Sequence, residues 1–368
     1  MTKPHIGQFI DSMDPGGAEE VVINLSCELV KRGYPVTVFH FGNPWLRSRI
    51  AEQGLTGCEL SLDHYKSMLT LPLFINRLRK VLKQNSVDIL HAHLLGAILA
   101  GALAARFAGI AAIGTIHDSY SLYESRLHPI YLGLASRAGA RLVAVANTMQ
   151  KEVVELSRLK PYAVSRIYNG ISLEKFAAAE RDSTSNGPVV VTTVARAVAV
   201  KRLDLLLRMA AAIDTDTDYR FRIVGDGPLL EELKAQAKTL GIEDRVEFLG
   251  HRDDVEKILA ESDIYALVSD SEGLSVSLLE SMASGLPSVV TDVGGNRELV
   301  ADGQSGLVAS PGNVVELTEK VTALIENAER RKQFGAEARR RVETQFSIEA
   351  MTDAYVRLFP ARAVRHAG

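Results

Sequence analysis

The segment IYALVSDSEGLSVSLLESMASGLPSVVT, residues 264–291, contains in one stretch the unit from which the fold is predicted. Its apolar run Ile264–Val268 predicts a buried strand, and the run Ser288–Thr291 predicts a second one. A polar loop and then a helical stretch separate the two. Apolar strands that are joined by helices are typical of parallel sheets that are covered on both faces.

This alternation of strand and helix extends over most of the chain in two series. A length of 368 residues makes two domains the expected organisation. In the first half, strands are expected at His5–Ile10, Val36–Phe41, Asp88–His91, Ala112–Ile116, Leu142–Ala146 and Val164–Tyr168. In the second half, they are expected at Val189–Val194, Arg220–Val224, Val246–Leu249, Ile264–Val268, Ser288–Thr291 and Gly306–Val308. The polar segment Glu180–Pro188 between the two series is expected to be a linker.

The composition excludes several classes of protein. A net charge of −3 and a pI near 6.3 argue against a nucleic-acid binder, which normally carries a basic excess. Cys27 and Cys58 are not in a metal-type or redox-type spacing, so they are expected to be reduced thiols of a cytoplasmic protein. The N-terminus lacks the apolar region of a secretory signal. Leu94–Ile116 is apolar but is interrupted by Arg106 and glycines, so a helix followed by a strand is expected there.

Three loops that follow predicted strands could bind a ligand, because ligands of parallel α/β sheets lie beyond the carboxyl ends of the strands. Gly16 and Gly17, in DSMDPGGAE, allow close approach of backbone amides at a helix start; a plain tight turn is the alternative. Arg196 and Lys201 follow another strand and are well placed to hold a diphosphate; solvated loop charges are the alternative. Gly225, in GDGP, is typical of a turn that packs a helix start against a strand.

The loop and helix of the first segment give the most specific pattern. Glu272 lies in the loop and Glu280 in the helix, a separation that suits two ends of one extended ligand. The amides of Gly273, Leu274 and Ser275 lie at the helix entry, where a phosphate is stabilised by the helix dipole. The alternative is a glutamate that complements the dipole together with a solvated helix glutamate.

Histidines mark the ends of two further predicted strands. His91 and His93 have a spacing that could suggest a metal, but no carboxylate or cysteine stands nearby in sequence, so no metal site is predicted. His117, followed by Asp118, is expected to face the same ligand cleft, whereas a satisfied structural histidine is the alternative.

Together these motifs resemble those of the retaining glycosyltransferases of family 4, which have the GT-B fold. The matching pieces are DPGGAE at 14–19, TIHD at 115–118, YNGIS at 168–172, Arg196 with Lys201, GDGP at 225–228, Glu272 with Glu280, and VGGNRELV at 293–300. The resemblance implies two Rossmann-like α/β domains whose parallel sheets face a central cleft. The expected parts are an acceptor-side domain at 1–170, a linker at 171–188, a domain that binds the nucleotide-sugar at 189–345, and a helix at 346–368 that crosses back to the first domain.

The resemblance also implies a role for each site residue. Arg196 and Lys201 would bind the donor's phosphates, Glu280 the ribose, and Glu272 the hydroxyls of the transferred sugar. The residues implied in catalysis are Glu272, His117, Arg196 and Lys201. Those implied in donor binding are Gly16, Gly17, Arg196, Lys201, Gly225, Gly273, Leu274, Ser275 and Glu280. Ala195 and Arg202 stand where the family often has glycine, which affects the expected backbone geometry of that loop.

The expected function is transfer of a sugar from a nucleoside-diphosphate sugar, a UDP-sugar by the family's example, to a hydroxyl of a glycan, glycolipid or polysaccharide-type acceptor. Retention of the anomeric configuration is expected, with no metal or other cofactor. A sugar-nucleotide epimerase or hydrolase on the same scaffold, or a non-catalytic subunit of a polysaccharide assembly, is the alternative. The basic, apolar segment Leu71–Lys83 could contact the inner face of the membrane, or could be an ordinary packed helix. The oligomeric state is not predicted.

Overall fold

The computed structural model describes residues 3–65, 69–118, 120–176 and 187–360. Contacts between Cα atoms divide the chain into two compact units. The first unit comprises Met1–Gly170 together with Ile348–Gly368, and the second comprises Ile171–Ser347. Most of the expected linker at 171–188 lies outside the described residues, because 177–186 are not among them.

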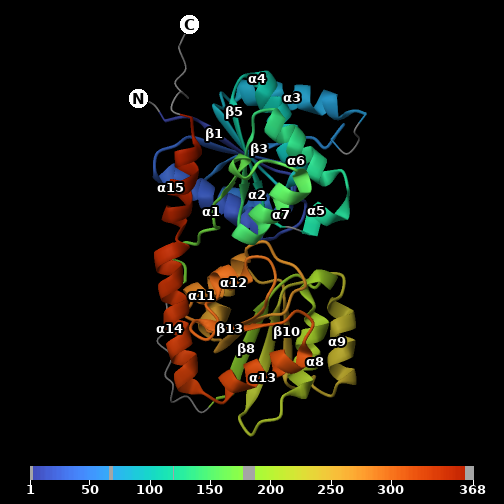
Figure 1. Cartoon of the computed structure of the whole chain (residues 1–368), viewed down its shortest axis with the longest axis vertical. Coiled ribbons are helices and arrows are strands. Elements are labelled where there is room, and N and C mark those ends of the chain that lie inside the picture. The colour runs from blue at the N-terminus through green and yellow to red at the C-terminus, as the bar shows by residue number, and fades with distance from the viewer. Residues whose placement is uncertain (1–2, 66–68, 119, 177–186, 361–368) are drawn as a thin grey trace. The chain divides into compact units, whose positions relative to one another are not determined.

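The first unit is built on a parallel sheet with seven strands among the described residues, in the order β3-β2-β1-β4-β5-β6-β7 (Figure 1). The strands are β1 Ile6–Ile10, β2 Val36–His40, β3 Thr56–Glu59, β4 Ile89–His93, β5 Ala111–Ile116, β6 Arg141–Ala144 and β7 Val164–Arg166. The six strands that were predicted for this half are all present. The additional strand is β3, an edge strand without a buried residue, which therefore has no apolar run to reveal it.

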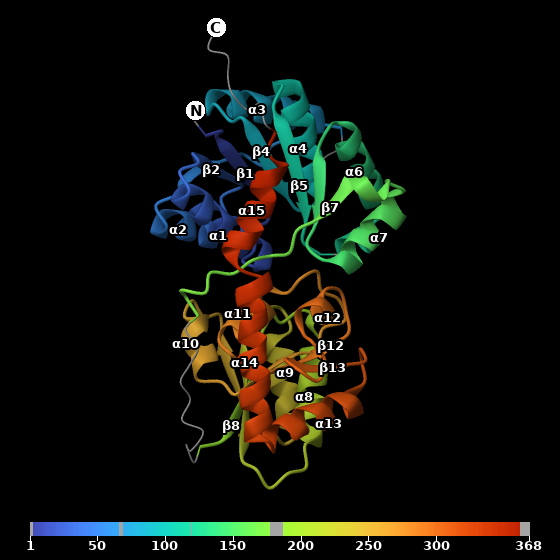
Figure 2. The ribbon, with the colours of Figure 1, turned by 60° about the vertical axis from the view of Figure 1, so that its left-hand side comes forward.

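Helices cover both faces of this sheet (Figures 1 and 2). Their bounds are α1 Gly17–Lys31, α2 Pro44–Glu52, α3 Leu71–Gln84, α4 Leu95–Ala108, α5 Tyr120–Glu124, α6 His128–Arg137, α7 Asn147–Ser157 and α15 Ile348–Leu358, with a 3₁₀ turn at Pro161–Ala163. Helix α15 packs against α1, while α3, α4 and α6 pack in series on the other side. Helix α4 and strand β5 divide the apolar stretch 94–116 in the expected way.

The second unit repeats the design with a parallel sheet of six strands in the part of the chain described, in the order β10-β9-β8-β11-β12-β13. The strands are β8 Val189–Val194, β9 Tyr219–Val224, β10 Val246–Gly250, β11 Ile264–Leu267, β12 Ser288–Thr291 and β13 Gly306–Ala309. The helices are α8 Leu203–Ala212, α9 Leu230–Thr239, α10 Val255–Ala260, α11 Val276–Ala283, α12 Asn296–Leu299, α13 Val314–Ile325 and α14 Ala328–Gln345, with a 3₁₀ turn at Ala199–Lys201. All six predicted strands of this half are confirmed.

Both sheets place a topological switch point at their centre. In the first unit the chain leaves β1 and β4 in opposite directions, and in the second unit it does so at β8 and β11. In open α/β sheets, ligands bind beyond the carboxyl ends of the two strands at such a point. The prediction of two Rossmann-like α/β domains is therefore confirmed, and each unit has one expected ligand position.

The amphipathic helix α3 buries its apolar side within the first unit. Its buried residues recur every three or four positions, which is the period of one helix face: Leu71, Phe74, Ile75, Leu78 and Leu82. The basic residues Arg77, Lys80 and Lys83 are exposed. Over the described ranges, no helix combines the length and the apolar character needed to cross a bilayer.

Candidate active site

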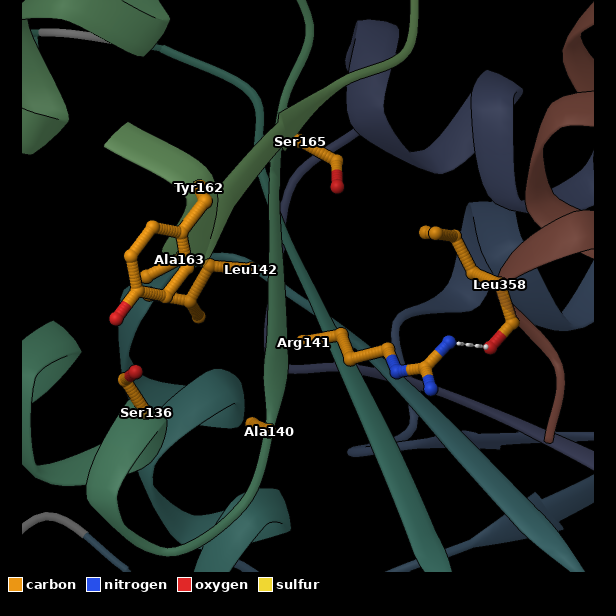
Figure 3. Close-up of a pocket in the computed structure, with 8 residues that line it drawn as sticks. All are labelled: Ser136, Ala140, Arg141, Leu142, Tyr162, Ala163, Ser165 and Leu358. Atoms are coloured by element: carbon orange, nitrogen blue, oxygen red, sulfur yellow. Dashed lines mark hydrogen bonds between the residues drawn. The ribbon is translucent and has the colours of Figure 1, made fainter. Parts of the chain in front are cut away.

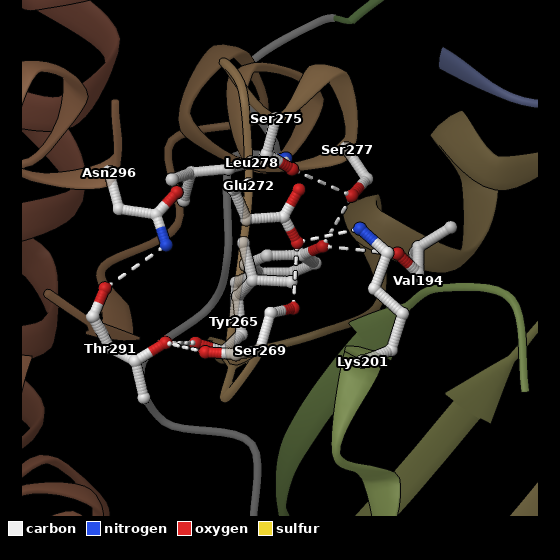
Figure 4. A network of polar contacts seen from close by, with 11 residues as sticks. Val194, Lys201, Tyr265, Ser269, Glu272, Ser275, Ser277, Leu278, Thr291 and Asn296 are labelled. Carbon is white, nitrogen blue, oxygen red and sulfur yellow. Dashed lines mark hydrogen bonds and ion pairs between the residues drawn. The ribbon is translucent and has the colours of Figure 1, made fainter. Parts of the chain in front are cut away.

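The centre of the second unit's site is an ion pair between Lys201 and Glu272. Lys201 ends the 3₁₀ turn after β8, and Glu272 lies in the loop after β11, so the pairing of these strands brings the two loops together. The Lys201 ammonium lies 2.6 Å from Glu272 Oε1, and the hydroxyl of Ser269 donates to the same oxygen over 2.7 Å (Figure 4). Glu272 is only 7% exposed. Its Oε2 has no hydrogen-bond partner among the described residues, so it can accept a bond from a ligand hydroxyl.

The loop that carries Glu272 is held in place by its neighbour after β12. Thr291 donates its hydroxyl to the Ser269 carbonyl at 2.7 Å, and the amide of Gly295 donates to the Gly273 carbonyl at 2.8 Å. Gly294 has φ +51°, and a Cβ there would collide with the Glu272 carbonyl. These backbone contacts fix the carboxylate before any ligand arrives, as electrostatic preorganisation requires.

Arg196 lies on the same loop as Lys201 but makes no ion pair or side-chain hydrogen bond with the described residues, and it is exposed. Gly225, with φ +132°, packs its backbone against this loop, because a Cβ there would collide with the Ala195 carbonyl. Gly225 therefore allows the backbone of its own loop to pack directly against the loop that carries Arg196. An exposed guanidinium on a firmly held loop is available to an anionic ligand.

Glu280 is half-buried on α11, at the same end of the sheet as Glu272. Burial raises the pKa of the Tyr265 hydroxyl, and the nearby charges of Glu272 and Glu280 raise it further, while the hydrogen bond to Ser277 opposes this. Since Glu272 is in a loop and Glu280 is in a helix, the two approach from different elements.

The residues at the entry of α11 form an N-terminal cap. Ser275 accepts a hydrogen bond from the Leu278 amide at 3.3 Å, which is the usual bond of a serine N-cap. Gly273, Leu274 and Ser275 are all buried. The cap keeps the positive end of the helix dipole directed at the loop that holds Glu272.

In the first unit, Gly16 and Gly17 open helix α1. Gly16 is the N-cap in an extended conformation, and Gly17 is the first helical residue and is exposed. Glu19 in the first turn is buried and its carboxylate lies near Gly16. An exposed glycine at a helix start permits close approach of a ligand to the backbone, as the sequence predicts.

His117 belongs to a buried polar cluster at the carboxyl ends of β1, β4 and β5. His93 Nδ1 lies 2.9 Å from His117 Nε2, and His93 Nε2 lies 2.8 Å from Gln8 Oε1. His91 bonds through Nε2 to the Thr115 hydroxyl at 2.8 Å. Every hydrogen-bonding group of this cluster except His117 is buried. The described residues contain no group of three or more metal-type ligands suited to hold an ion.

Burial keeps these histidines neutral. It lowers the pKa of His91 to about 3 and that of His117 to about 4. Burial, together with the neighbouring His91 and His117, also holds the pKa of His93 well below its usual value. Near pH 7 the cluster therefore acts through neutral hydrogen bonds and not through charge.

Sequence reasoning missed two further members of this cluster, Gln8 and Tyr355. The Tyr355 hydroxyl, from α15, lies 3.0 Å from the Thr115 hydroxyl, although 240 residues separate them. Gln8 is a single polar residue inside an apolar strand, and this isolation was the available signal.

Two features beside the cluster mark this end of the first sheet as unusual. Leu94, directly after His93, has φ +73° and ψ 155°, a region that non-glycine residues rarely occupy. Asp11, at the end of β1, accepts a hydrogen bond from the Tyr65 hydroxyl, and burial raises the pKa of its carboxyl. Strained backbone and desolvated carboxyls concentrate at functional sites.

A separate pocket of about 330 Å³ lies at the opposite, amino-terminal end of β6 and β7 (Figure 3). The charged residue in its lining, Arg141, donates to the Leu358 carbonyl at 2.6 Å. The remaining lining residues are small, apolar or hydroxyl-bearing. This pocket is distant in the fold from the strand ends that carry His117, so we do not place the active site there.

Comparison with known proteins agrees with this geometry. The family model described as Glycosyltransferase Family 4 matches residues 15–175, and the model described as Glycosyl transferases group 1 matches residues 176–341. An N-acetyl-alpha-D-glucosaminyl L-malate synthase of Bacillus anthracis is 27% identical over 361 residues, which cover 94% of this chain and 93% of that protein. A UDP-Gal:alpha-D-GlcNAc-diphosphoundecaprenol alpha-1,3-galactosyltransferase of Escherichia coli is 30% identical over 63% of this chain and 64% of its own length.

Among solved structures, HepE of Anabaena in complex with UDP-glucose superposes with a TM-score of 0.85 at 22% identity, over 96% of this chain and 99% of that one. Taken with the family models, the fold and the paired loops define a glycosyltransferase. The chain belongs to the family 4 glycosyltransferases, and its two Rossmann-like units are those of the GT-B fold.

Proposed function

We propose that this chain transfers a hexosyl group from a UDP-sugar to a hydroxyl of a glycan, glycolipid or polysaccharide-type acceptor, with retention and without a metal. The observation that carries the proposal is the Lys201–Glu272 pair together with the exposed Arg196, which has no ion-pair partner in the part of the chain that the structure describes. All three lie beyond the carboxyl ends of β8 and β11. The UDP-glucose complex of HepE and the UDP-Gal donor in the name of the E. coli relative support UDP as the nucleotide.

The mechanism rests on stabilising the leaving group. As the bond between the anomeric carbon and the β-phosphate oxygen breaks, negative charge grows on the diphosphate, and the cations of Lys201 and Arg196 act mainly at that stage. The acceptor hydroxyl bonds to the anomeric carbon, and its proton passes to the departing phosphate oxygen. For retention, the acceptor attacks from the face that the diphosphate leaves, where this oxygen is the nearest base. The two cations supply the charge for which other transferases use a metal.

Two carboxylates divide the recognition of the donor in this proposal. Glu280 binds the ribose, and Glu272 accepts hydrogen bonds from hydroxyls of the transferred sugar through its free Oε2. Glu280→Ala is therefore expected to weaken UDP binding by about 1.5–3 kcal/mol in titration calorimetry. Glu272→Ala is expected to lower turnover while leaving UDP affinity nearly unchanged. If both variants lost UDP affinity equally, this division of roles would be wrong.

A screen and a control reaction test the rest of the proposal. Thermal-shift measurements against UDP-, GDP- and ADP-sugars should show the largest stabilisation with a UDP-sugar. Incubation of a UDP-sugar without acceptor should leave it intact. Accumulation of an epimerised sugar nucleotide would instead identify an epimerase, and free sugar would identify a hydrolase. Full activity after treatment with EDTA is expected for a metal-independent reaction.

We further propose that peripheral membrane contact, if the acceptor is a glycolipid, uses α5 and α6 and not α3. The apolar side of α3 is packed inside the first unit. In contrast, large apolar residues with exposures from 43% to 63% follow one another along α5 and α6: Tyr120, Tyr123, Leu127, Ile130 and Leu134. The exposed Arg126 lies within this run and the exposed Arg137 follows it, and such a surface is suited to an anionic bilayer.

Vesicle sedimentation with anionic lipid distinguishes the two helices. Leu127→Ser/Ile130→Ser should reduce binding, whereas Lys80→Ser/Lys83→Ser on α3 should reduce it much less. Equal loss in both variants would show that α3 contributes as much as α5 and α6, and a loss confined to the lysine variant would show that basic charge on α3 drives the contact. An absence of wild-type binding would exclude the contact.

A further inference from the structure

A continuous line of hydrogen bonds runs from Gln8 on β1, through His93 on β4, to His117 after β5. Gln8 Oε1 lies 2.8 Å from His93 Nε2, and His93 Nδ1 lies 2.9 Å from His117 Nε2. Gln8 and His93 are fully buried, with 0% exposure each. His117 is partly exposed, and its Nδ1 has no hydrogen-bond partner among the described residues. The line thus begins at Gln8 in the core and ends at His117, whose Nδ1 is available to a ligand.

With the amide of Gln8 oriented so that Oε1 faces His93, proton counting along this line leaves one arrangement. A neutral imidazole has one nitrogen that donates and one that accepts. Because Gln8 Oε1 can only accept, His93 must carry its proton on Nε2. His93 Nδ1 must then accept, and the proton between the two rings belongs to His117 Nε2. The lone pair of His117 is therefore on Nδ1.

We propose that Gln8, acting through His93, is a positioning residue that fixes the Nε2–H tautomer of His117 and leaves Nδ1 as a hydrogen-bond acceptor. Rotation of the Gln8 amide by half a turn would reverse every bond of the line and make Nδ1 a donor. The amide of one buried glutamine thereby sets the hydrogen-bonding character of the open nitrogen of His117.

The surroundings of the line favour a fixed neutral state. The titratable groups that face it are His91, whose ring centroid lies 4.0 Å from that of His93, and Tyr355, whose ring centroid lies 4.7 Å from that of His91. Burial lowers the pKa of His91 and His117 far below 7, so both rings are neutral near pH 7 and each carries one ring proton. Tyr355 is engaged with the Thr115 hydroxyl.

Two energetically unfavourable features accompany this line of hydrogen bonds, which indicates that the line has a functional role. Gln8 Nε2 is buried without a hydrogen-bond partner among the described residues, which is unfavourable and which a leucine at this position would avoid. Leu94, which follows His93, holds a strained backbone conformation. Both features lower the stability of the fold. Their presence therefore indicates that the orientation of the His93 ring is under a constraint other than stability.

If the proposed function holds, His117 Nδ1 accepts a hydrogen bond from a hydroxyl of the donor sugar or of the acceptor. The tautomer itself does not depend on that function, so the two can be tested apart. Nitrogen-15 NMR of labelled histidines distinguishes protonated from unprotonated ring nitrogens in the intact protein. Near pH 7, His117 and His93 of the wild type should both show protonated Nε2 and unprotonated Nδ1.

Gln8→Leu removes the fixed acceptor while filling a similar volume. His117 is then expected to show a mixture of both tautomers. The kcat for sugar transfer should fall about tenfold, which corresponds to the loss of one hydrogen bond, while UDP affinity should stay within about twofold. Thr115→Val is the matched control, because it removes buried hydrogen bonds to His91 and Tyr355 but none from the line. It should leave the His117 tautomer as in the wild type.

A protonated Nδ1 on His117 in the wild type would overturn the proposal, and so would an unchanged His117 spectrum in Gln8→Leu. The expected spectra in a chain that transfers no sugar would support the line of hydrogen bonds and refute only the proposed function. A fall in kcat of equal size in Thr115→Val would show that general loosening, and not the tautomer, lowers the rate.

Discussion

The two units share one strand topology but place opposite kinds of polar groups at their central switch points. The second unit presents charge, with the Lys201–Glu272 pair and the exposed Arg196. The first unit presents neutral groups, the three histidines held in hydrogen bonds with Gln8 and Thr115. The same scaffold thus supports either a charged or a neutral site, because the choice is made by a few loop and strand-end residues.

This difference suits the proposed chemistry. In the proposed function, a departing diphosphate needs cations, which Lys201 and Arg196 of the second unit would provide. The hydroxyls of the sugar and of the acceptor need hydrogen-bonding groups without net charge, which His117 of the first unit would provide. Acid, substitution of the cations and substitution at Leu94 should each affect the charged and the neutral site differently.

Acid should produce the largest effect and should act on the first unit. His91 and His117 have folded pKa values near 3 and 4, below the usual 6.5, so the folded state binds fewer protons than the unfolded state in this window. Stability present above pH 6.5 is therefore lost as pH falls towards 4 and then 3, at about 1.4 kcal/mol per pH unit for each histidine. The second unit contains only His251 among its described residues, and that side chain is exposed.

The single tryptophan, Trp45, lies in α2 of the first unit, so its fluorescence during urea unfolding reports on that unit. Hydrogen exchange of the second unit's amides gives the comparison. Unfolding of the first unit that is independent of pH between 7 and 4.5 would contradict neutral burial of the histidines.

Removal of the paired cation should produce the next largest effect. Lys201→Ala should lower kcat/KM about 10²–10³-fold, because a preplaced positive group no longer meets the departing diphosphate. Lys201→Arg, which keeps the charge and the bond to Glu272, is the matched control and should lose much less. A loss below threefold in the alanine variant, measured by steady-state kinetics, would exclude a role for Lys201 in the transition state.

Arg196→Ala should have a smaller effect, on binding. We expect the UDP affinity to fall by about 1.5–3 kcal/mol, and the loss should shrink at high salt because the guanidinium is exposed. Arg208→Ala removes another exposed arginine, from α8, and should leave the affinity unchanged. Titration calorimetry at two ionic strengths measures both, and equal losses in the two variants would indicate a general charge effect.

The smallest effect concerns the strained backbone in the neutral site. At Leu94, φ is positive, so Leu94→Gly should be more stable to unfolding than Leu94→Ala by about 1–3 kcal/mol. At the exposed Leu73 inside helix α3, the order should reverse, with alanine better than glycine by about 1 kcal/mol. Thermal unfolding of the four variants provides the test, and the same order at both positions would show that Leu94 is not strained.

The sequence pointed to the residues of the charged site, although not to the Lys201–Glu272 pair itself, and to only part of the neutral site, for a physical reason. Apolar runs located the strands, and strand ends then located Lys201 and Glu272, since each lies in the loop region that follows its strand. Strand β3 escaped because it is an exposed edge. The neutral site needs the register of three strands, which pairs Gln8 with His91 and His93 with Thr115, and no local pattern contains that information.

The C-terminal helix α15 has a consequence for how the chain is made. It belongs to the first unit, where Tyr355 meets Thr115, Asp353 pairs with Arg32, and the Gly170 amide contacts Met351 Sδ at 3.1 Å. During translation, helix α15, which completes the first unit, leaves the ribosome only after the whole of the second unit has been synthesised. The second unit can thus complete its folding before the first. A fragment that ended at Gly170 would lack α15, and one side of the histidine cluster in the first unit would be uncovered.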